Sequence, residues 1–140
     1  MSRTPPEDTV QGARADRRRI VVVGVCASGK TELVERLRAR GYDAHQCAQE
    51  HSYVPTMWQQ MARPDVLIYL EASRETVARR LERDFSEQDW QEQRRRLAHA
   101  AMHADLIIGT DDLTPDEVFE RVSGFLRDTH VGPGSALKPA

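Results

Sequence analysis

Residues 20–31 of this chain read Ile-Val-Val-Val-Gly-Val-Cys-Ala-Ser-Gly-Lys-Thr. Four β-branched apolar residues precede the spacing G-x-x-x-x-G-K-[ST], which predicts a buried strand, a phosphate-binding loop and the start of a helix. Glycines let backbone N–H groups turn inward around phosphate oxygens at a helix N-terminus, whose dipole favours anions. The alternative is a chance glycine turn carrying a lysine. The strand, loop and helix context favours phosphate binding.

The loop is expected to bind the phosphates of a nucleoside triphosphate. Lys30 is expected to reach the β- and γ-phosphates, and the Thr31 hydroxyl is expected to ligate a Mg²⁺ ion that bridges phosphate oxygens. The residues of the loop predicted to bind the nucleotide are Gly24, Val25, Cys26, Ala27, Ser28, Gly29, Lys30, Thr31 and Glu32.

Length and composition restrict the remaining classes of protein. A chain of 140 residues is expected to form one domain. Its net charge of −2, with both signs mixed, gives no field for nucleic acid or an anionic membrane, so we expect neither as a partner. No apolar run reaches a membrane span, and we expect a cytoplasmic protein. Two cysteines form neither a zinc spacing nor a disulfide framework. A homo-oligomer remains an alternative.

Strand-like and helix-like segments alternate between polar, aperiodic ends. We expect disordered tails over residues 1–17 and 129–140 and one domain over residues 18–128. The expected strands are residues 19–25, 42–48, 65–71 and 104–109. The expected helices cover residues 30–40, a segment around 54–61, a stretch over 77–103 that is broken near 84–86, and a capped segment from 114 onward. This order predicts a compact α/β fold, with about four parallel strands sandwiched by helices.

Several of these segments together resemble a known family. They are the 24–31 loop, the strand ending Ile-Tyr-Leu-Glu-Ala-Ser at residues 68–73, Glu75 followed by Arg79 and Arg80, and Thr110-Asp111 before a capped helix. Over about residues 19–127 the chain resembles the small-molecule kinases of the P-loop nucleoside triphosphate hydrolase superfamily, the nucleotide and shikimate kinase-like group.

The resemblance implies how the rest of the site is built. It implies a P-loop fold with an arginine-rich helical lid, in which Arg79, Arg80 and Arg83 approach the transferred phosphoryl group. Guanidinium groups suit that role because they stay ionised and bind phosphate oxygens in pairs. It also implies that the backbone from Thr110, with Asp111, contacts the adenine of ATP. Between residues 41 and 64 there is room for one strand where the family has two, so a reduced acceptor region or a loss of transferase activity stays open.

A second polar cluster, Gln49 to Tyr53, follows the expected second strand. Ligands of open α/β sheets bind at the carboxyl ends of strands, which places this cluster beside the loop. Glu50 is the candidate for holding Mg²⁺ or accepting a hydroxyl proton, and His51 is a candidate proton partner or phosphate contact. The alternative is an ordinary polar loop. Tyr53 and Trp58 are candidates for an acceptor pocket or for the core.

Two functions follow from these residues. The first is an ATP- and Mg²⁺-dependent phosphotransferase that acts on an unidentified small-molecule acceptor. The second is an ATP-binding regulatory module or slow ATPase without kinase activity. A GTPase switch that reads guanine through N-K-x-D is excluded, because the chain contains no asparagine. ATP is therefore favoured over GTP, and recognition of guanine by other groups stays open.

Overall fold

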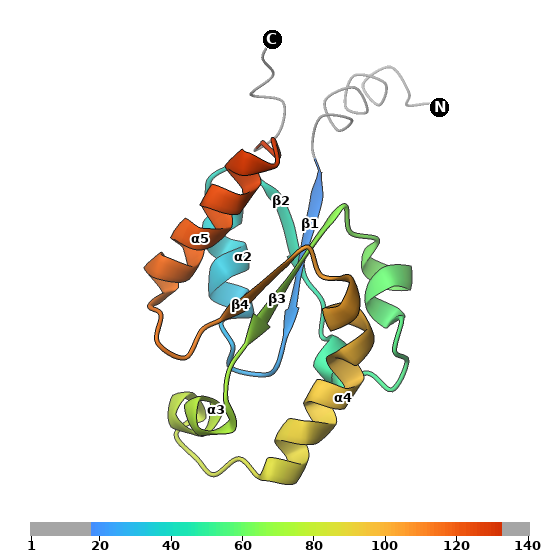
Figure 1. The fold of residues 1–140 in the computed structure, drawn as a ribbon, viewed down its shortest axis with the longest axis vertical. Helices are drawn as coiled ribbons and strands as arrows, with labels where there is room; N and C mark the ends of the chain where they lie inside the picture. The colour runs from blue at the N-terminus through green and yellow to red at the C-terminus, as the bar shows by residue number, and fades with distance from the viewer. Residues whose placement is uncertain (1–17, 133–140) are drawn as a thin grey trace, which may run out of the picture.

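A computed structural model describes residues 18–132, in which four parallel strands form one sheet (Figure 1). The strand order is β2-β1-β3-β4. The bounds are β1 (Arg19–Gly24), β2 (Asp43–Gln46), β3 (Val66–Glu71) and β4 (Leu106–Gly109). The predicted α/β class with four parallel strands is confirmed. The tail predicted over residues 1–17, and residues 133–140 of the other predicted tail, lie outside the described residues.

Helices cover both faces of the sheet (Figure 1). Helices α2 (Lys30–Ala39) and α5 (Pro115–Asp128) lie on one face, and α4 (Glu87–His103) lies on the other. Successive residues of a strand point to opposite faces. Ile20 and Val22 of β1 therefore pack with α2 and α5, while Val21 and Val23 pack with α4. The central strands have almost no polar positions because both of their faces are covered.

Three of the helices begin directly after a residue whose side chain caps them. Ser73 and Ser86 accept hydrogen bonds from Thr76 N and Asp89 N, so α3 (Arg74–Leu81) and α4 are each capped by a serine hydroxyl. Thr114 and Glu117 form the predicted capping box of α5. The stretch predicted from residue 77 in fact begins at Arg74, because its cap fixes the first turn earlier. It breaks at Glu82, whose φ of 57° is left-handed.

Two segments differ from expectation. In place of a regular helix over residues 54–61, the chain forms turns and a single π-helical turn, η2 (Trp58–Ala62), which ends where Arg63 takes a left-handed φ of 48°. The predicted boundary at residue 128 is also too early. Val131 is buried in the core beside α5, and its N–H donates to Leu126 O at 2.8 Å. A single apolar residue after a helix forms no periodic pattern in the sequence. The sequence therefore does not reveal that packing in the core buries Val131.

None of the helices within residues 18–132 has the length and apolar character that crossing a bilayer requires.

Gly24 should be the glycine whose substitution disturbs the fold most directly. A Cβ at this position would overlap the carbonyl oxygen of Leu70 in β3 and lie 2.7 Å from Ser28 Oγ. Overpacking of this kind typically costs 1–3 kcal/mol, and backbone cannot move as a side chain can, so we expect Gly24→Ala to lower the free energy of unfolding by about 3 kcal/mol. Urea denaturation measures this change.

Gly124→Ala is the matched control. Its nearest neighbour would be Arg127 Nη2 at 3.8 Å, and it lies within α5. Alanine is favoured over glycine in a helix, so the control should gain about 0.5–1 kcal/mol. Equal stability of the Gly24→Ala variant and the unsubstituted protein would contradict the close approach of β1 and β3.

Candidate functional site

Four connections meet at the carboxyl edge of the sheet, because all four strands run in the same direction. They are the 24–31 loop after β1, the turn η1 (Gln49–His51) after β2, the start of α3 after β3, and the segment 110–114 after β4. Ligands of parallel α/β sheets bind at this edge. The topology thus brings together most of the residues predicted from the sequence.

The 24–31 loop directs a helix N-terminus toward this edge. Gly29 is the N-cap of α2 with a φ of 103°, and no side chain caps the helix. The first N–H groups of an uncapped helix have no partner within the helix. Ala27 also has a left-handed φ, of 59°, which is uncommon for a residue with a Cβ. The loop therefore has a constrained conformation that leaves amide donors at the start of α2.

Lys30 is buried beneath this loop. Its side chain is 8% exposed, and Nζ donates to the carbonyl oxygens of Gly24 and Val25 at 3.0 and 3.1 Å. The ammonium also pairs with Glu50 Oε2 at 2.9 Å, and the Glu50 side chain is 5% exposed. Burying two charges is costly unless they are paired and hydrogen-bonded. The pair therefore joins the end of β1 to the turn that follows β2.

Two buried side-chain oxygens beside this pair lack partners. Among residues 18–132, Ser28 Oγ and Glu50 Oε1 are the buried side-chain polar atoms that form no hydrogen bond. Buried polar groups in native proteins are almost always satisfied, and exceptions are common where a ligand or ion belongs. Ser28 lies two residues before Lys30 in the chain, and Oε1 belongs to the carboxylate that pairs with Lys30. These two oxygens are therefore the polar groups here that a ligand could satisfy.

Thr31 lies at the exposed start of α2, where its hydroxyl accepts a hydrogen bond from Gln46 Nε2 at 3.0 Å. Gln46 is the last residue of β2. Within residues 18–132 no group of three His, Cys, Asp or Glu side chains is placed to hold a metal ion. Any metal held here would depend on oxygens of a bound ligand in addition to Thr31 and Glu50.

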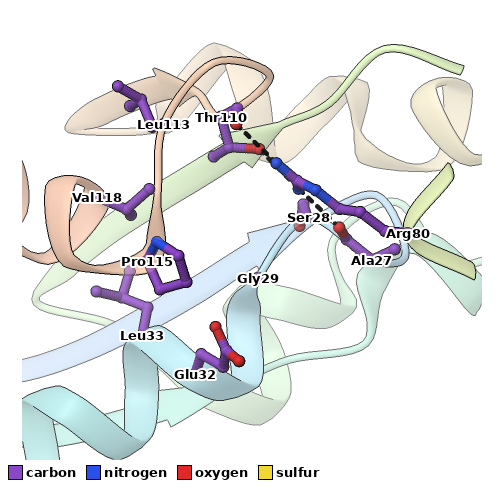
Figure 2. A pocket seen from close by; sticks show the side chains of 10 residues that line it. All are labelled: Ala27, Ser28, Gly29, Glu32, Leu33, Arg80, Thr110, Leu113, Pro115 and Val118. Carbon is purple, nitrogen blue, oxygen red and sulfur yellow. Dashed lines mark hydrogen bonds between the residues drawn. The ribbon is translucent and has the colours of Figure 1, made fainter. Parts of the chain in front are cut away.

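A cavity of about 420 Å³ lies on the other side of the loop (Figure 2). Arg80 lines one end of it and joins the loop to Thr110, donating to Ala27 O at 2.9 Å, to Thr110 O at 2.7 Å and to Thr110 Oγ1 at 3.1 Å. Figure 2 shows this guanidinium facing a wall of apolar side chains. That wall contains Leu33, Leu113, Pro115 and Val118. Glu32 lines the cavity beside Gly29.

The other two candidate arginines lie elsewhere. Arg79 donates to Thr76 Oγ1 at 3.4 Å, and Arg83 donates to Asp84 O at 3.3 Å. Arg83 does not lie on the helix that carries Arg79 and Arg80, because α3 ends at Leu81. Of the three, Arg80 is the arginine that contacts the 24–31 loop.

His51 and Asp111 occupy the margin of the site. His51 Nε2 is 3.7 Å from Glu50 Oε2, and the imidazole is 61% exposed. Asp111 accepts a hydrogen bond from Ser73 N at 2.8 Å, and this bond is the main reason that the pKa of its carboxyl is lowered. Asp111 holds the β4 connection to the start of α3 and does not line the cavity.

The two aromatic candidates separate clearly. Trp58 is 4% exposed and donates its indole N–H to His99 Nδ1 at 3.1 Å, so it belongs to the core. Tyr53 is 82% exposed, and the Arg96 guanidinium lies 4.3 Å from its ring centroid. Tyr53 therefore lies on the surface beside the Glu50 turn rather than in an enclosed pocket.

Three glutamines that were assigned no individual role from the sequence support the site. Gln46 contacts Thr31, and Gln93 of α4 accepts from Cys26 N at 2.9 Å. Gln49 is fully buried: its amide donates to Val54 O and Arg96 O and accepts from Trp58 N. A glutamine in a polar segment carries no sign of burial. That such a glutamine is buried becomes clear only from the residues that it bonds to, some of which lie far away in the sequence.

No protein-family model and no curated protein matches this sequence.

The Lys30–Glu50 pair predicts non-additive stability. Lys30→Met alone leaves the Glu50 carboxylate buried without its cation, which should cost about 3–5 kcal/mol. Adding Glu50→Gln removes the uncompensated charge, so the double variant should recover more than half of that loss. Urea unfolding of the two single variants and the double variant measures the coupling. Additive losses would show that the two charges do not interact.

The two cysteines should differ in reactivity. Burial, reinforced by the nearby Glu50 charge, raises the pKa of the Cys47 thiol, so its reactive thiolate is scarce near neutral pH. Cys26 is only half-buried. We expect a thiol reagent at pH 7.5 to label Cys26 in the folded protein and Cys47 only after unfolding. Labelling of Cys26→Ser and Cys47→Ser variants assigns each rate. Fast labelling of folded Cys26→Ser would contradict the burial of Cys47.

Proposed function

We propose that this chain binds ATP with Mg²⁺ and transfers its γ-phosphoryl group to a small-molecule acceptor, on a P-loop fold of the nucleotide and shikimate kinase-like type. The observation that carries the proposal is the buried Lys30, paired with Glu50 at an uncapped helix N-terminus, where Ser28 Oγ and Glu50 Oε1 are buried without partners. A cation, free amide donors and a carboxylate in one place match the needs of phosphoryl transfer, which depends on positioning and charge stabilisation.

The proposed nucleotide lies across the 24–31 loop. Its phosphates take the N-terminal amides of α2, and Lys30 exchanges its contacts with Gly24 O and Val25 O for phosphate oxygens. The base enters the cavity between Arg80 and the apolar wall of Leu33 and Val118. A flat aromatic base suits a pocket with a guanidinium on one side and aliphatic groups on the other.

Glu50 supports the acceptor half of the proposal. Its Oε2 holds Lys30, while its buried Oε1 has no partner among the described residues. That oxygen is available to accept the proton of an acceptor hydroxyl. Together with Thr31 it also fits Mg²⁺, which binds few protein oxygens when phosphates supply others. When bound, Mg²⁺ would neutralise charge on the phosphate oxygens. His51 Nε2 lies 3.7 Å from Glu50 Oε2, beyond a direct hydrogen bond, so in this proposal His51 would act on the carboxylate through a bridging water.

A second function is favoured by the small size of the acceptor region. Residues 41–64 supply one short strand and two short helical turns, and Tyr53 lies exposed on their surface. A chain with this geometry can bind and slowly hydrolyse ATP as a regulatory module without a small-molecule acceptor. Under this alternative, closure of the arginine-bearing α3 segment is what a protein partner reads.

Nucleotide binding should depend on Lys30. A hydrogen bond between charged groups is worth about 1.5–3 kcal/mol, so we expect Lys30→Ala to weaken ATP binding by about 10- to 100-fold in titration calorimetry with Mg²⁺. The Lys30→Ala/Glu50→Gln variant guards against unfolding caused by an unpaired Glu50. Arg121→Ala, which removes an exposed positive charge on α5, is the matched control. Equal ATP affinity in all variants would exclude the proposal.

Transfer of the γ-phosphoryl group to an organic acceptor distinguishes the kinase from the regulatory module or slow ATPase. With γ-labelled ATP and a mixture of hydroxylated metabolites, a kinase should yield a labelled organic product, and Glu50→Gln should reduce that yield by about 10²- to 10⁴-fold while ATP still binds. Release of labelled inorganic phosphate alone would favour the regulatory module or slow ATPase.

A further inference from the structure

Gln93 of α4 is bonded to a single residue of the 24–31 loop by both ends of its amide. Cys26 N donates to Gln93 Oε1 at 2.9 Å, and Gln93 Nε2 donates to Cys26 Sγ at 3.4 Å. Gln93 is 7% exposed and lies 67 residues away in the chain. The amide orientation is fixed, because a backbone N–H can only donate and must meet the oxygen. No residue of the mechanism proposed above requires this contact.

The contact determines which loop amides remain for a ligand. Cys26 N is directed toward α4, and Ser28 N donates to Val25 O at 3.2 Å. These two amides are therefore already bonded within the protein. The donors that remain for phosphate include the amides at the start of α2, after Gly29, which no side chain caps. Val25 and Cys26, which the sequence predicts to contact the nucleotide, already have these bonds within the protein: Cys26 N donates to Gln93, and Val25 O accepts from Ser28 N and Lys30 Nζ.

Helix α4 can fix the position of the loop, because it is itself bonded to other segments around the site. Trp90 Nε1 donates to Ala72 O at 2.9 Å, which fixes α4 to the segment after β3. One turn beyond Gln93, Arg96 Nη1 donates to Glu50 O at 3.3 Å, and Gln49 Nε2 donates to Arg96 O at 3.2 Å. The same helix thus holds both the loop that carries Lys30 and the turn that carries Glu50.

We propose that Gln93 is a positioning residue that keeps the 24–31 loop in its anion-binding conformation. This inference rests on the proposed function, since it concerns the phosphate site of that function. Between the Gln93 contact at Cys26 and the helix start at Gly29, the loop passes through Ala27, whose φ of 59° is disfavoured for alanine. Without the Gln93 contact the loop loses the restraint nearest to this residue. Other loop conformations then become populated, and apparent affinity falls in proportion to the competent fraction.

The test compares two identical substitutions on one helix. Gln93→Met keeps side-chain volume and removes both hydrogen bonds, whereas Gln91→Met changes an exposed glutamine that bonds to Glu87 Oε2. The probe is inorganic tripolyphosphate, measured by titration calorimetry at a temperature at which every variant is folded. We expect Gln93→Met to weaken binding about tenfold, as when the competent fraction falls to about a tenth, and Gln91→Met to stay within about twofold.

Two further readouts distinguish positioning from a general loss of stability. Affinity for ATP should fall in Gln93→Met by the same factor as affinity for tripolyphosphate, because the cavity beside Arg80 is untouched. The Cys26 thiol should also be labelled faster in Gln93→Met, and tripolyphosphate should slow that labelling. If Gln93→Met does not fold, Gln93→Asn, whose amide is one methylene too short to reach Cys26, replaces it with the same expected loss.

The outcomes separate the two hypotheses. If the unsubstituted protein binds neither tripolyphosphate nor ATP, the proposed function fails and the inference fails with it. If it binds both, but the Gln93 variant binds them as tightly as Gln91→Met does, the inference alone is overturned. Faster Cys26 labelling with unchanged affinity would also overturn it, since Gln93 would then hold the cysteine without shaping the anion site.

Discussion

A lysine ammonium lies inside this protein, and much of the local structure can be understood as compensation for its charge. Lys30 Nζ is surrounded by two carbonyl oxygens of the 24–31 loop and by Glu50 Oε2. The Coulomb attraction of a buried pair repays desolvation only when further hydrogen bonds satisfy the charged groups. The loop must therefore curl around the ammonium, and the turn after β2 must bring Glu50 to it. Neither segment can move independently of the other.

The sheet and most helices could be predicted because their signals are local. β1 and β3 are continuous apolar runs, and Ser73, Ser86 and Thr114 cap the helices that follow them. The segment before β3 could not be predicted in the same way. Its course follows Gln49, whose buried amide binds Val54 O and Trp58 N and holds the chain in turns. A single glutamine that holds the backbone up to Trp58, nine positions later, forms no periodic pattern that would reveal this role in the sequence.

The residues of the candidate site could likewise be predicted only where their signals are local in the sequence. Lys30 and Glu50 were predicted, because a fixed spacing and the carboxyl ends of parallel strands are visible in the sequence. The choice of Arg80 among three arginines was not, because it depends on where α3 ends. Glu82 takes a left-handed conformation, which stops the helix before Arg83 and leaves Arg80 to bond Ala27 O and Thr110 O. Gln93 was missed because its partner is 67 residues away.

The internal contacts of the site also limit how tightly it can hold an anion. Lys30 already has oxygen partners, so a phosphate must displace protein acceptors rather than water from its ammonium. Exchange of a bond to a neutral carbonyl for a bond to a charged phosphate oxygen still favours binding, but part of the gain is offset by the carbonyl bonds that are lost. Further affinity must then come from donors that lack partners, which are the amides at the start of α2 and the Ser28 hydroxyl. A carboxylate oxygen repels a bare phosphate, whereas a cation placed between the two relieves that repulsion. The unpartnered Glu50 oxygen therefore favours an anion that arrives with its own divalent cation over one that arrives alone.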